Sequence, residues 1–223
     1  MADWGTLKKM AAESAVAQVL DGMVVGLGTG STAEFVLLAL ARRIREGLRI
    51  TGVPTSERAA ARARELSIPL TELTGPIDIA IDGADEVDSR TLDVIKGRGG
   101  ALLREKIVAQ AAERFIVVVD QTKLFDQLGA GPVPVEVVPF GWRATACTLE
   151  KRGVKFERRD LVTDNGNYIL DCHFGPIESP AALAADLDRT VGVVEHGLFL
   201  GLAAEVHVGT LKGVRRLLRQ LPE

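Results

Sequence analysis

Residues 26–32 read GLGTGST, and this run sets the topology that we expect for the chain. It follows the apolar run Met23 to Val25 and precedes residues 33–38, AEFVLL, so it marks a turn from a buried strand into a helix. Ser31 and Glu34 match a capping box, which predicts that the helix starts at Ser31. A strand, a glycine-rich turn and a helix form the first unit of a parallel α/β sheet.

The same alternation of apolar strands and helices continues to residue 120. The expected strands are residues 23–27, 49–53, 77–81, 92–95 and 115–120, and the expected helices are residues 7–21, 31–45, 55–66 and 101–113. Aromatic residues make up only 4% of the chain, whereas Ala, Val, Leu and Ile dominate, which suits helices packed on both faces of a buried sheet. We therefore predict an α/β fold with a Rossmann-like, mostly parallel sheet domain.

A second, smaller domain is indicated by a change of pattern after Lys123. Three prolines lie from Pro132 to Pro139, and such a cluster is typical of a domain boundary, which we place near residue 130. Beyond it we expect helices at 142–151 and 180–187, a strand at 191–194 and a hairpin over 162–171, where Asn165-Gly166 separates two β-prone runs.

These elements predict that residues 131–204 form a small, inserted α+β lid domain. Residues 1–130 plus about 205–223 are expected to form the Rossmann-like catalytic domain. Its last segment should add a strand at 205–208 and a basic helix at 211–221.

Composition excludes several classes of protein. Lys and Arg number 27 against 30 Asp and Glu, and a net charge of −3 argues against a surface built for nucleic acid or anionic lipid. No stretch reaches the roughly 18 consecutive apolar residues of a membrane span, and the N-terminal residues lack the pattern of a secretory signal. The two cysteines, Cys147 and Cys172, fit no metal-ligand spacing. We expect a cytoplasmic protein without nucleic-acid or membrane partners.

The glycine turn has the features of a phosphate site. Its free backbone N–H groups and the start of the following helix favour an anion, and the hydroxyls of Thr29, Ser31 and Thr32 add donors. A dinucleotide fingerprint would need glycine where Ser31 stands, and a Walker turn would need a lysine before Ser31 or Thr32. The turn therefore predicts a phosphate monoester ligand, and a turn without any ligand stays open as the alternative.

Two carboxylates follow the apolar strand at 77–81. Asp82 and Asp85 lie just beyond its carboxyl end, where ligands bind in open α/β sheets. They can bind sugar hydroxyls, move protons or hold a divalent cation, and an all-oxygen Mg²⁺ site remains an alternative although no histidine lies near in sequence. For Glu86 and Asp88 we expect a solvated loop.

A second glycine loop, Lys96 to Gly100, opens the helix that carries Glu105. The dipole of that helix should keep Glu105 ionised, so that it can act as a base, while Lys96 and the loop N–H groups stabilise an oxyanion. This pairing is what proton abstraction next to a carbonyl requires. The alternative is that Glu105 pairs with a neighbouring cation on a solvated helix face. Lys123, at the end of another strand, can reach the same ligand.

Together these motifs resemble the type A ribose-5-phosphate isomerase family over almost the whole chain. The resemblance rests on the order and spacing of GTGST (28–32), DGADE (82–86), KGRGGALLREK (96–106), DQTK (120–123), PVPVEVVP (132–139) and TDNGNYILD (163–171). It implies interconversion of D-ribose 5-phosphate and D-ribulose 5-phosphate without metal or organic cofactor. It also implies a homodimer or homotetramer.

The resemblance further implies the role of each site residue. Glu105 would be the base that moves the proton between C2 and C1. Asp82 and Asp85 would handle hydroxyl protons and ring opening, and Lys96 would stabilise the enediolate. The implied substrate-binding set is Thr29, Gly30, Ser31, Thr32, Asp82, Gly83, Ala84, Asp85, Lys96, Gly97, Arg98, Gly99 and Lys123.

Two other classes of function are compatible with these motifs. One is a sugar-phosphate-sensing module of related fold, although such a module would normally carry a DNA-binding segment and none is evident here. The other is an acyl-transfer enzyme of the CoA-transferase kind, with a glutamate as nucleophile. Arg98 also departs from an all-glycine loop, and its side chain would be strained if its backbone needed a positive φ, so its role stays open.

Overall fold

The strand, turn and helix at residue 26 lie inside a six-stranded sheet in the computed structural model, which describes residues 3–220. The strand order is β14-β13-β6-β3-β1-β2, and every neighbouring pair is parallel except β13 with β14. Its strands are β1 (Val24–Leu27), β2 (Thr51–Pro54), β3 (Ile77–Asp82), β6 (Ala112–Asp120), β13 (Ala203–Thr210) and β14 (Gly213–Leu218). The predicted α/β fold with a mostly parallel sheet is confirmed.

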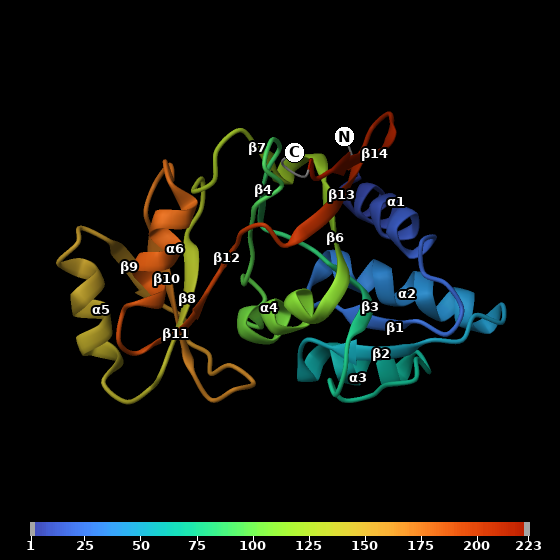
Figure 1. Ribbon diagram of the computed structural model, residues 1–223, viewed down its shortest axis with the longest axis horizontal. Helices are drawn as coiled ribbons and strands as arrows, with labels where there is room; N and C mark the ends of the chain where they lie inside the picture. The colour runs from blue at the N-terminus through green and yellow to red at the C-terminus, as the bar shows by residue number, and fades with distance from the viewer. Residues whose placement is uncertain (1–2, 221–223) are drawn as a thin grey trace.

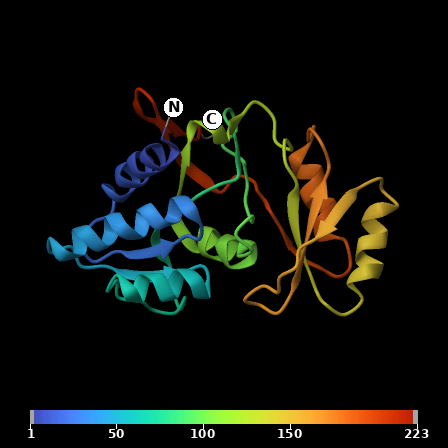
Figure 2. The ribbon, with the colours of Figure 1, turned by 180° about the vertical axis from the view of Figure 1, so that it is seen from behind.

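Helices cover both faces of this sheet (Figures 1 and 2). The helices of this part of the chain are α1 (Trp4–Val16), α2 (Ser31–Arg45), α3 (Glu57–Glu65) and α4 (Leu102–Ala111). Strand β6 shows why the sheet needs two covers: Ile116 and Val118 pack in the core with α1 and α2, whereas Val117 and Val119 pack in the core with α4. Successive strand residues point to opposite faces, so an apolar run requires apolar cover on each side.

A separate antiparallel sheet forms the small lobe at the other end of the molecule (Figure 1). Its strand order is β11-β8-β10-β9, and its elements are β8 (Val133–Val137), α5 (Trp142–Glu150), β9 (Lys155–Arg158), β10 (Tyr168–His173), α6 (Pro180–Asp188) and β11 (Val193–His196). All of them fall within residues 131–204. The division into two domains with these boundaries stays a prediction.

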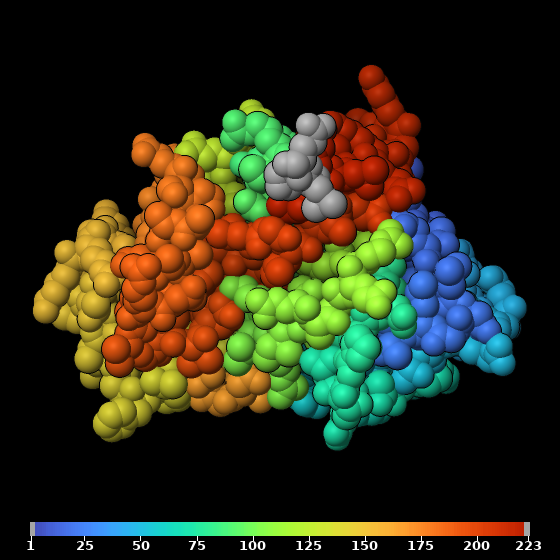
Figure 3. Space-filling view, in the orientation of Figure 1, coloured from blue at the N-terminus to red at the C-terminus, as the bar shows by residue number. Residues whose placement is uncertain are grey.

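A third sheet of very short strands lies between the two lobes (Figure 1). It has the order β12-β5-β4-β7, from β4 (Glu86–Asp88), β5 (Val94–Ile95), β7 (Leu124–Phe125) and β12 (Leu198–Phe199), with a short 3₁₀ turn, η1 (Gln121–Lys123), before β7. In the space-filling view the orange small lobe and the blue-to-teal large lobe meet along the green surface of α4 (Figure 3).

The expectation that Glu86 and Asp88 lie in a solvated loop is wrong. Both are buried in β4, and the carboxylate of Glu86 accepts hydrogen bonds from the backbone N–H groups of three consecutive residues, 129–131, at 2.8, 3.2 and 2.5 Å. A buried carboxylate needs such donors. Glu86 therefore fixes the chain at the point where it leaves for the small lobe.

The predicted basic helix at 211–221 is also wrong for the part that the structure describes, and residue 221 lies outside the described residues. After a turn in which Gly213 has a φ of 117°, the chain returns as β14 and pairs antiparallel with β13. Pairing with β13 outweighs the helix propensity of Leu and Arg, because a helix in this segment would leave the backbone groups on one side of β13 unpaired.

The predicted hairpin at 162–171 is shifted. Its second strand exists as β10, but the partner strand is β9, so the connection spans residues 159–167 and Val162 lies in the loop. Gly166 does take a positive φ, 80°, as the Asn-Gly signal requires. No helix in residues 3–220 combines the length and apolar content needed to cross a bilayer.

Candidate active site

The carboxyl ends of β1, β3 and β6 open into one cavity of about 360 Å³. The residues around it come from the glycine turn after β1, the acidic turn after β3, the glycine loop after β5 and η1 after β6. The lining residues are Lys8, Thr29, Gly30, Ser31, Thr32, Arg58, Gly83, Ala84, Asp85, Lys96, Gly97, Arg98, Gly99, Glu105 and Lys123. Every residue that the sequence predicted for the site lines this cavity, apart from Asp82, which lies against Lys96.

Asp82, Lys96 and Glu105 form a buried charge cluster, the central feature of the site. The ammonium Nζ of Lys96 lies 2.9 Å from Asp82 Oδ2 and 3.4 Å from Glu105 Oε2, and all three residues are at most 3% exposed. Lys96 Nζ also donates to the backbone oxygen of Gly83 at 2.6 Å. Two carboxylates thus share one buried ammonium.

The charge state of this cluster follows from its burial. Burial raises the pKa of Glu105 to about 8; Lys96 opposes that rise, while Asp82 and Asp85 add to it. The pKa of Asp82 is also raised by burial, against the effect of Lys96 and of two backbone N–H donors. Burial alone would lower the pKa of Lys96, but the two carboxylates raise it, so the ammonium stays charged.

Within the cluster, the negative charge is better supported on Asp82 than on Glu105. Asp82 Oδ1 accepts from the backbone N–H groups of Thr29 at 3.1 Å and Gly83 at 2.7 Å, whereas Asp82 Oδ2 and Glu105 Oε2 both face the ammonium of Lys96. The expectation that the dipole of α4 keeps Glu105 ionised is wrong, because desolvation exceeds the effect of one helix start.

Gly28 is the residue that lets Asp82 reach this position. A Cβ atom at residue 28 would lie 2.1 Å from Asp82 Oδ1 and 2.6 Å from Asp82 Cβ. Both contacts are far shorter than van der Waals separation. The first glycine motif therefore serves the acid cluster as well as the helix start.

The start of α2 offers an anion site at the other end of the cavity. Gly30, with a φ of 124°, precedes the helix, and no side chain caps its first N–H groups. The predicted helix start at Ser31 is confirmed, but the predicted capping box does not form: Gly30 is the N-cap residue, and Glu34 pairs with Arg62 at 2.7 Å. Unsatisfied N–H groups at a helix start attract a phosphate.

Basic side chains surround this helix start. Lys8 Nζ donates to Ser31 Oγ at 2.9 Å, and Arg58 and Lys123 line the same cavity. The hydroxyl of Thr29, by contrast, is bonded within the protein to the hydroxyls of Thr55 and Ser56, both at 2.7 Å. Thr29 thus contributes to the site through its backbone and its packing.

Sequence reasoning missed Lys8 and Arg58. A signal for Arg58 existed, because Thr55-Ser56 follows the carboxyl end of β2 just as the predicted loops follow their strands. Lys8 had none. It comes from α1, and only the packing of α1 beside α2 brings it to Ser31.

The glycine loop explains why Arg98 is tolerated. The positive φ angles fall on Gly97, 110°, and Gly100, 80°, so Arg98 is not strained. Its backbone N–H donates to Asp85 Oδ2 at 3.0 Å, and its guanidinium Nε lies 3.8 Å from Asp85 Oδ1. Asp85 is thereby held at the rim of the cavity.

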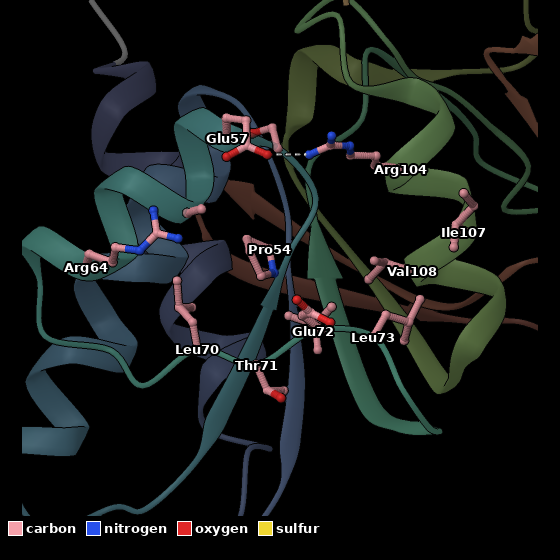
Figure 4. A pocket seen from close by; sticks show the side chains of 13 residues that line it. Pro54, Glu57, Arg64, Leu70, Thr71, Glu72, Leu73, Arg104, Ile107 and Val108 are labelled. Atoms are coloured by element: carbon pink, nitrogen blue, oxygen red, sulfur yellow. Dashed lines mark hydrogen bonds and ion pairs between the residues drawn. The ribbon is translucent and has the colours of Figure 1, made fainter. Parts of the chain in front are cut away.

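A larger cavity of about 550 Å³ lies between β2, α3, residues 70–73 and α4 (Figure 4). Its walls are mostly apolar, and its charged rim includes the ion pair of Glu57 with Arg104 at 2.9 Å. The Asp82–Lys96–Glu105 cluster is not part of its lining, so we assign the chemistry to the smaller cavity. The alternative that Glu105 pairs on a solvated helix face is wrong as well, since Glu105 is buried and faces Lys96.

Fold and cavity together define a two-lobed α/β protein with a buried charge cluster in a cavity at the carboxyl ends of its parallel strands. The family model of ribose 5-phosphate isomerase A (phosphoriboisomerase A) matches residues 51–213. The ribose-5-phosphate isomerase A of Gluconobacter oxydans is 56% identical over 223 residues, which cover 95% of this chain and 96% of that protein. The chain belongs to the ribose 5-phosphate isomerase A family and is an isomerase.

Solved structures agree with this membership over nearly the full length. A D-ribose-5-phosphate isomerase in complex with phospho-erythronic acid matches with a TM-score of 0.94 at 42% identity, covering 98% of this chain and 100% of that chain. Ribose 5-phosphate isomerase A from Methanocaldococcus jannaschii matches with a TM-score of 0.92 at 43% identity, covering 96% and 98%.

Proposed function

We propose that this chain interconverts D-ribose 5-phosphate and D-ribulose 5-phosphate through an enediolate, with Glu105 as the general base. The observation that carries the proposal is the buried Asp82–Lys96–Glu105 cluster beside a cavity whose opposite end is basic. Membership in the family supports the substrate, and so does the relative solved with phospho-erythronic acid, a small phosphorylated acid.

The phosphate end of the substrate belongs at the start of α2. Backbone N–H groups of Ser31 and Thr32 would donate to the phosphate, and Lys8, Arg58 and Lys123 would supply positive charge. This placement directs the sugar carbons toward the glycine loop and Glu105, across the cavity.

The reaction then needs one base and one oxyanion site. Glu105 takes the hydrogen of C2 as a proton, and the electron pair of that C–H bond forms the C1=C2 double bond while negative charge develops on O1. Lys96 and the N–H groups of the glycine loop stabilise this oxygen. A proton passes from O2 to O1, so that the C2 ketone and the C1 hydroxyl form, and the electron pair of the C1=C2 bond takes the proton back from Glu105 at C1. Asp85 lines the cavity and would handle the hydroxyl protons, including those of ring opening, whereas Asp82 lies behind Lys96 and acts through that ammonium.

The direct test is formation of ribulose 5-phosphate from ribose 5-phosphate by the purified protein, with and without EDTA. We expect equal rates, because the ammonium of Lys96 supplies the positive charge that a metal ion would otherwise bring to the oxyanion. Absence of ketose in both conditions would reject the proposed function. Loss of the rate in EDTA, with recovery on adding Mg²⁺, would instead support the divalent cation site at Asp82 and Asp85.

A further inference from the structure

Arg159 connects the small lobe to the glycine loop of the active site. Its Nε and Nη2 donate to the two carboxylate oxygens of Asp171, both at 2.6 Å, and its Nη1 donates to the backbone oxygens of Gly97 at 2.7 Å and Arg98 at 3.1 Å. The side chains of Arg159 and Asp171 are only 14% and 19% exposed. A forked guanidinium held on one side by a carboxylate is a rigid donor.

The two carbonyls that Arg159 binds determine where the loop N–H groups point. In a planar trans peptide the C=O and the N–H point in opposite directions. When Arg159 holds the oxygens of Gly97 and Arg98, the N–H groups of Arg98 and Gly99 are directed to the other side of the loop. That of Arg98 meets Asp85, a cavity residue, and that of Gly99 has no acceptor within residues 3–220.

We propose that Arg159 is a positioning residue for the isomerase reaction, because it fixes the Arg98–Gly99 peptide so that the N–H group of Gly99 can donate to the developing oxyanion. The inference rests on the proposed function. Each residue that lines the cavity precedes residue 124, so Arg159 lets the small lobe act on the chemistry without touching the substrate. Without it, Gly97 is free to change conformation, since glycine has few steric limits.

The test compares Arg159→Gln with a matched control, Arg158→Gln. Arg158 precedes Arg159 in the chain but stacks its guanidinium 5.0 Å from the ring of Tyr168 and is exposed. We expect Arg159→Gln to lower kcat by about 10- to 100-fold, less than the full loss of an oxyanion donor, with KM for ribose 5-phosphate within about 3-fold. Arg158→Gln should leave both constants unchanged.

Chemical rescue separates positioning from a general loss of structure. In Arg159→Ala, added guanidinium ion at millimolar concentration should restore part of kcat, because it can occupy the space between Asp171 and the two carbonyls. Unchanged kcat in Arg159→Gln would overturn the inference. A loss in Arg159→Ala that guanidinium does not reverse, with unfolding seen by circular dichroism in both variants, would overturn it too.

A binding measurement keeps this inference separate from the proposed function. Titration calorimetry with phospho-erythronic acid should show about 10-fold weaker binding to Arg159→Gln than to the unchanged protein, because with its phosphate at the start of α2 its carboxylate would face the glycine loop. Equal affinities would overturn the role of Arg159 whether or not the protein turns over ribose 5-phosphate. If the unchanged protein makes no ribulose 5-phosphate, the proposed function fails, and the calorimetry still decides on Arg159.

Discussion

Replacing Glu105 by Gln should change activity and stability in opposite directions. The substitution nearly keeps the shape of the side chain but removes the carboxylate that lies 3.4 Å from Lys96 Nζ. Because this carboxylate is the proposed base, we expect kcat to fall by ~10²- to 10⁴-fold. KM should stay within a few-fold, because the phosphate is held at the other end of the cavity.

The effect on stability depends on pH, and its sign follows from the raised pKa. Burial raises the pKa of Glu105 from 4.5 to about 8, so the folded state holds this proton more tightly than the unfolded state does. The stability that Glu105 contributes is full below the unfolded pKa and is lost as the pH rises through the folded pKa. Glutamine does not titrate. As the pH rises from the unfolded pKa to the folded pKa of Glu105, the variant should therefore become increasingly stable relative to the unchanged protein. Above the folded pKa this difference in stability should stay constant.

The size of this gain has an upper limit set by the same shift. The difference between the two pKa values corresponds to roughly 5 kcal/mol if Glu105 titrates alone. Asp82 and Lys96 titrate with it, so the cluster shares the effect. We expect the free energy of unfolding to rise by about 1–3 kcal/mol in Glu105→Gln at alkaline pH, and by much less at a pH near the pKa of Glu105 in the unfolded state.

Two measurements on the same preparation check these statements. Initial rates of ribulose 5-phosphate formation give kcat and KM, and urea unfolding at pH near 5 and near 9 gives the two free energies. Glu113→Gln is the matched control, since Glu113 is an exposed carboxylate of the neighbouring strand β6 and should change neither quantity. Turnover near that of the unchanged protein would place the base elsewhere. An equal change of stability at both pH values would show that Glu105 does not hold a buried proton.

Three further outcomes follow from the geometry of the cavity. The value of kcat/KM should rise with pH on a limb near 8, where Glu105 ionises, and a limb near 4.5 in the pH–rate profile would contradict this. In Lys96→Met the residual activity should rise at still higher pH, because Lys96 lowers the pKa of Glu105. Gly28→Ala should lower kcat by ~10²-fold or more and reduce the melting temperature, since the new Cβ would lie 2.1 Å from Asp82 Oδ1, and a fully active variant would show that Asp82 can move freely. Lys8→Gln should raise KM for ribose 5-phosphate about 10-fold with little change of kcat, and an unchanged KM would remove Lys8 from the phosphate site.

The sequence predicted the strand-end loops of the site because a parallel sheet brings the carboxyl ends of its strands to one edge. Asp82 ends β3 and Lys123 follows β6, two neighbouring strands of the parallel sheet, so their convergence needed no knowledge of packing. Lys8 and Arg159 reach the site from a helix face and from another lobe. No local pattern marks such residues, since only tertiary packing sets their position.

Errors arose where a local preference was outweighed by a distant contact. The last described segment, rich in Leu and Arg, favours a helix locally but forms β14 because β13 needs a partner. Glu34 fits a capping box by spacing, yet Arg62 of α3 draws its carboxylate away. The ionisation of Glu105 was predicted from its helix alone, whereas its burial under Lys96 and Asp82 sets its pKa.

The Asp82–Lys96–Glu105 cluster shows how a buried carboxylate can serve as a base. A carboxylate out of water resists ionisation, but the ammonium 3.4 Å away offsets part of that cost, and the pKa near 8 leaves a useful fraction ionised at neutral pH. In the proposed reaction, Glu105 becomes neutral when it takes the C2 proton, and the enediolate oxygen becomes negative beside the same ammonium. The total charge around Lys96 then stays constant along the proton transfer, so Lys96 stabilises the base before the step and the oxyanion after it. Lys96 therefore acts at both stages of the proton transfer. Removing it should cost more activity than the loss of a single contact would suggest.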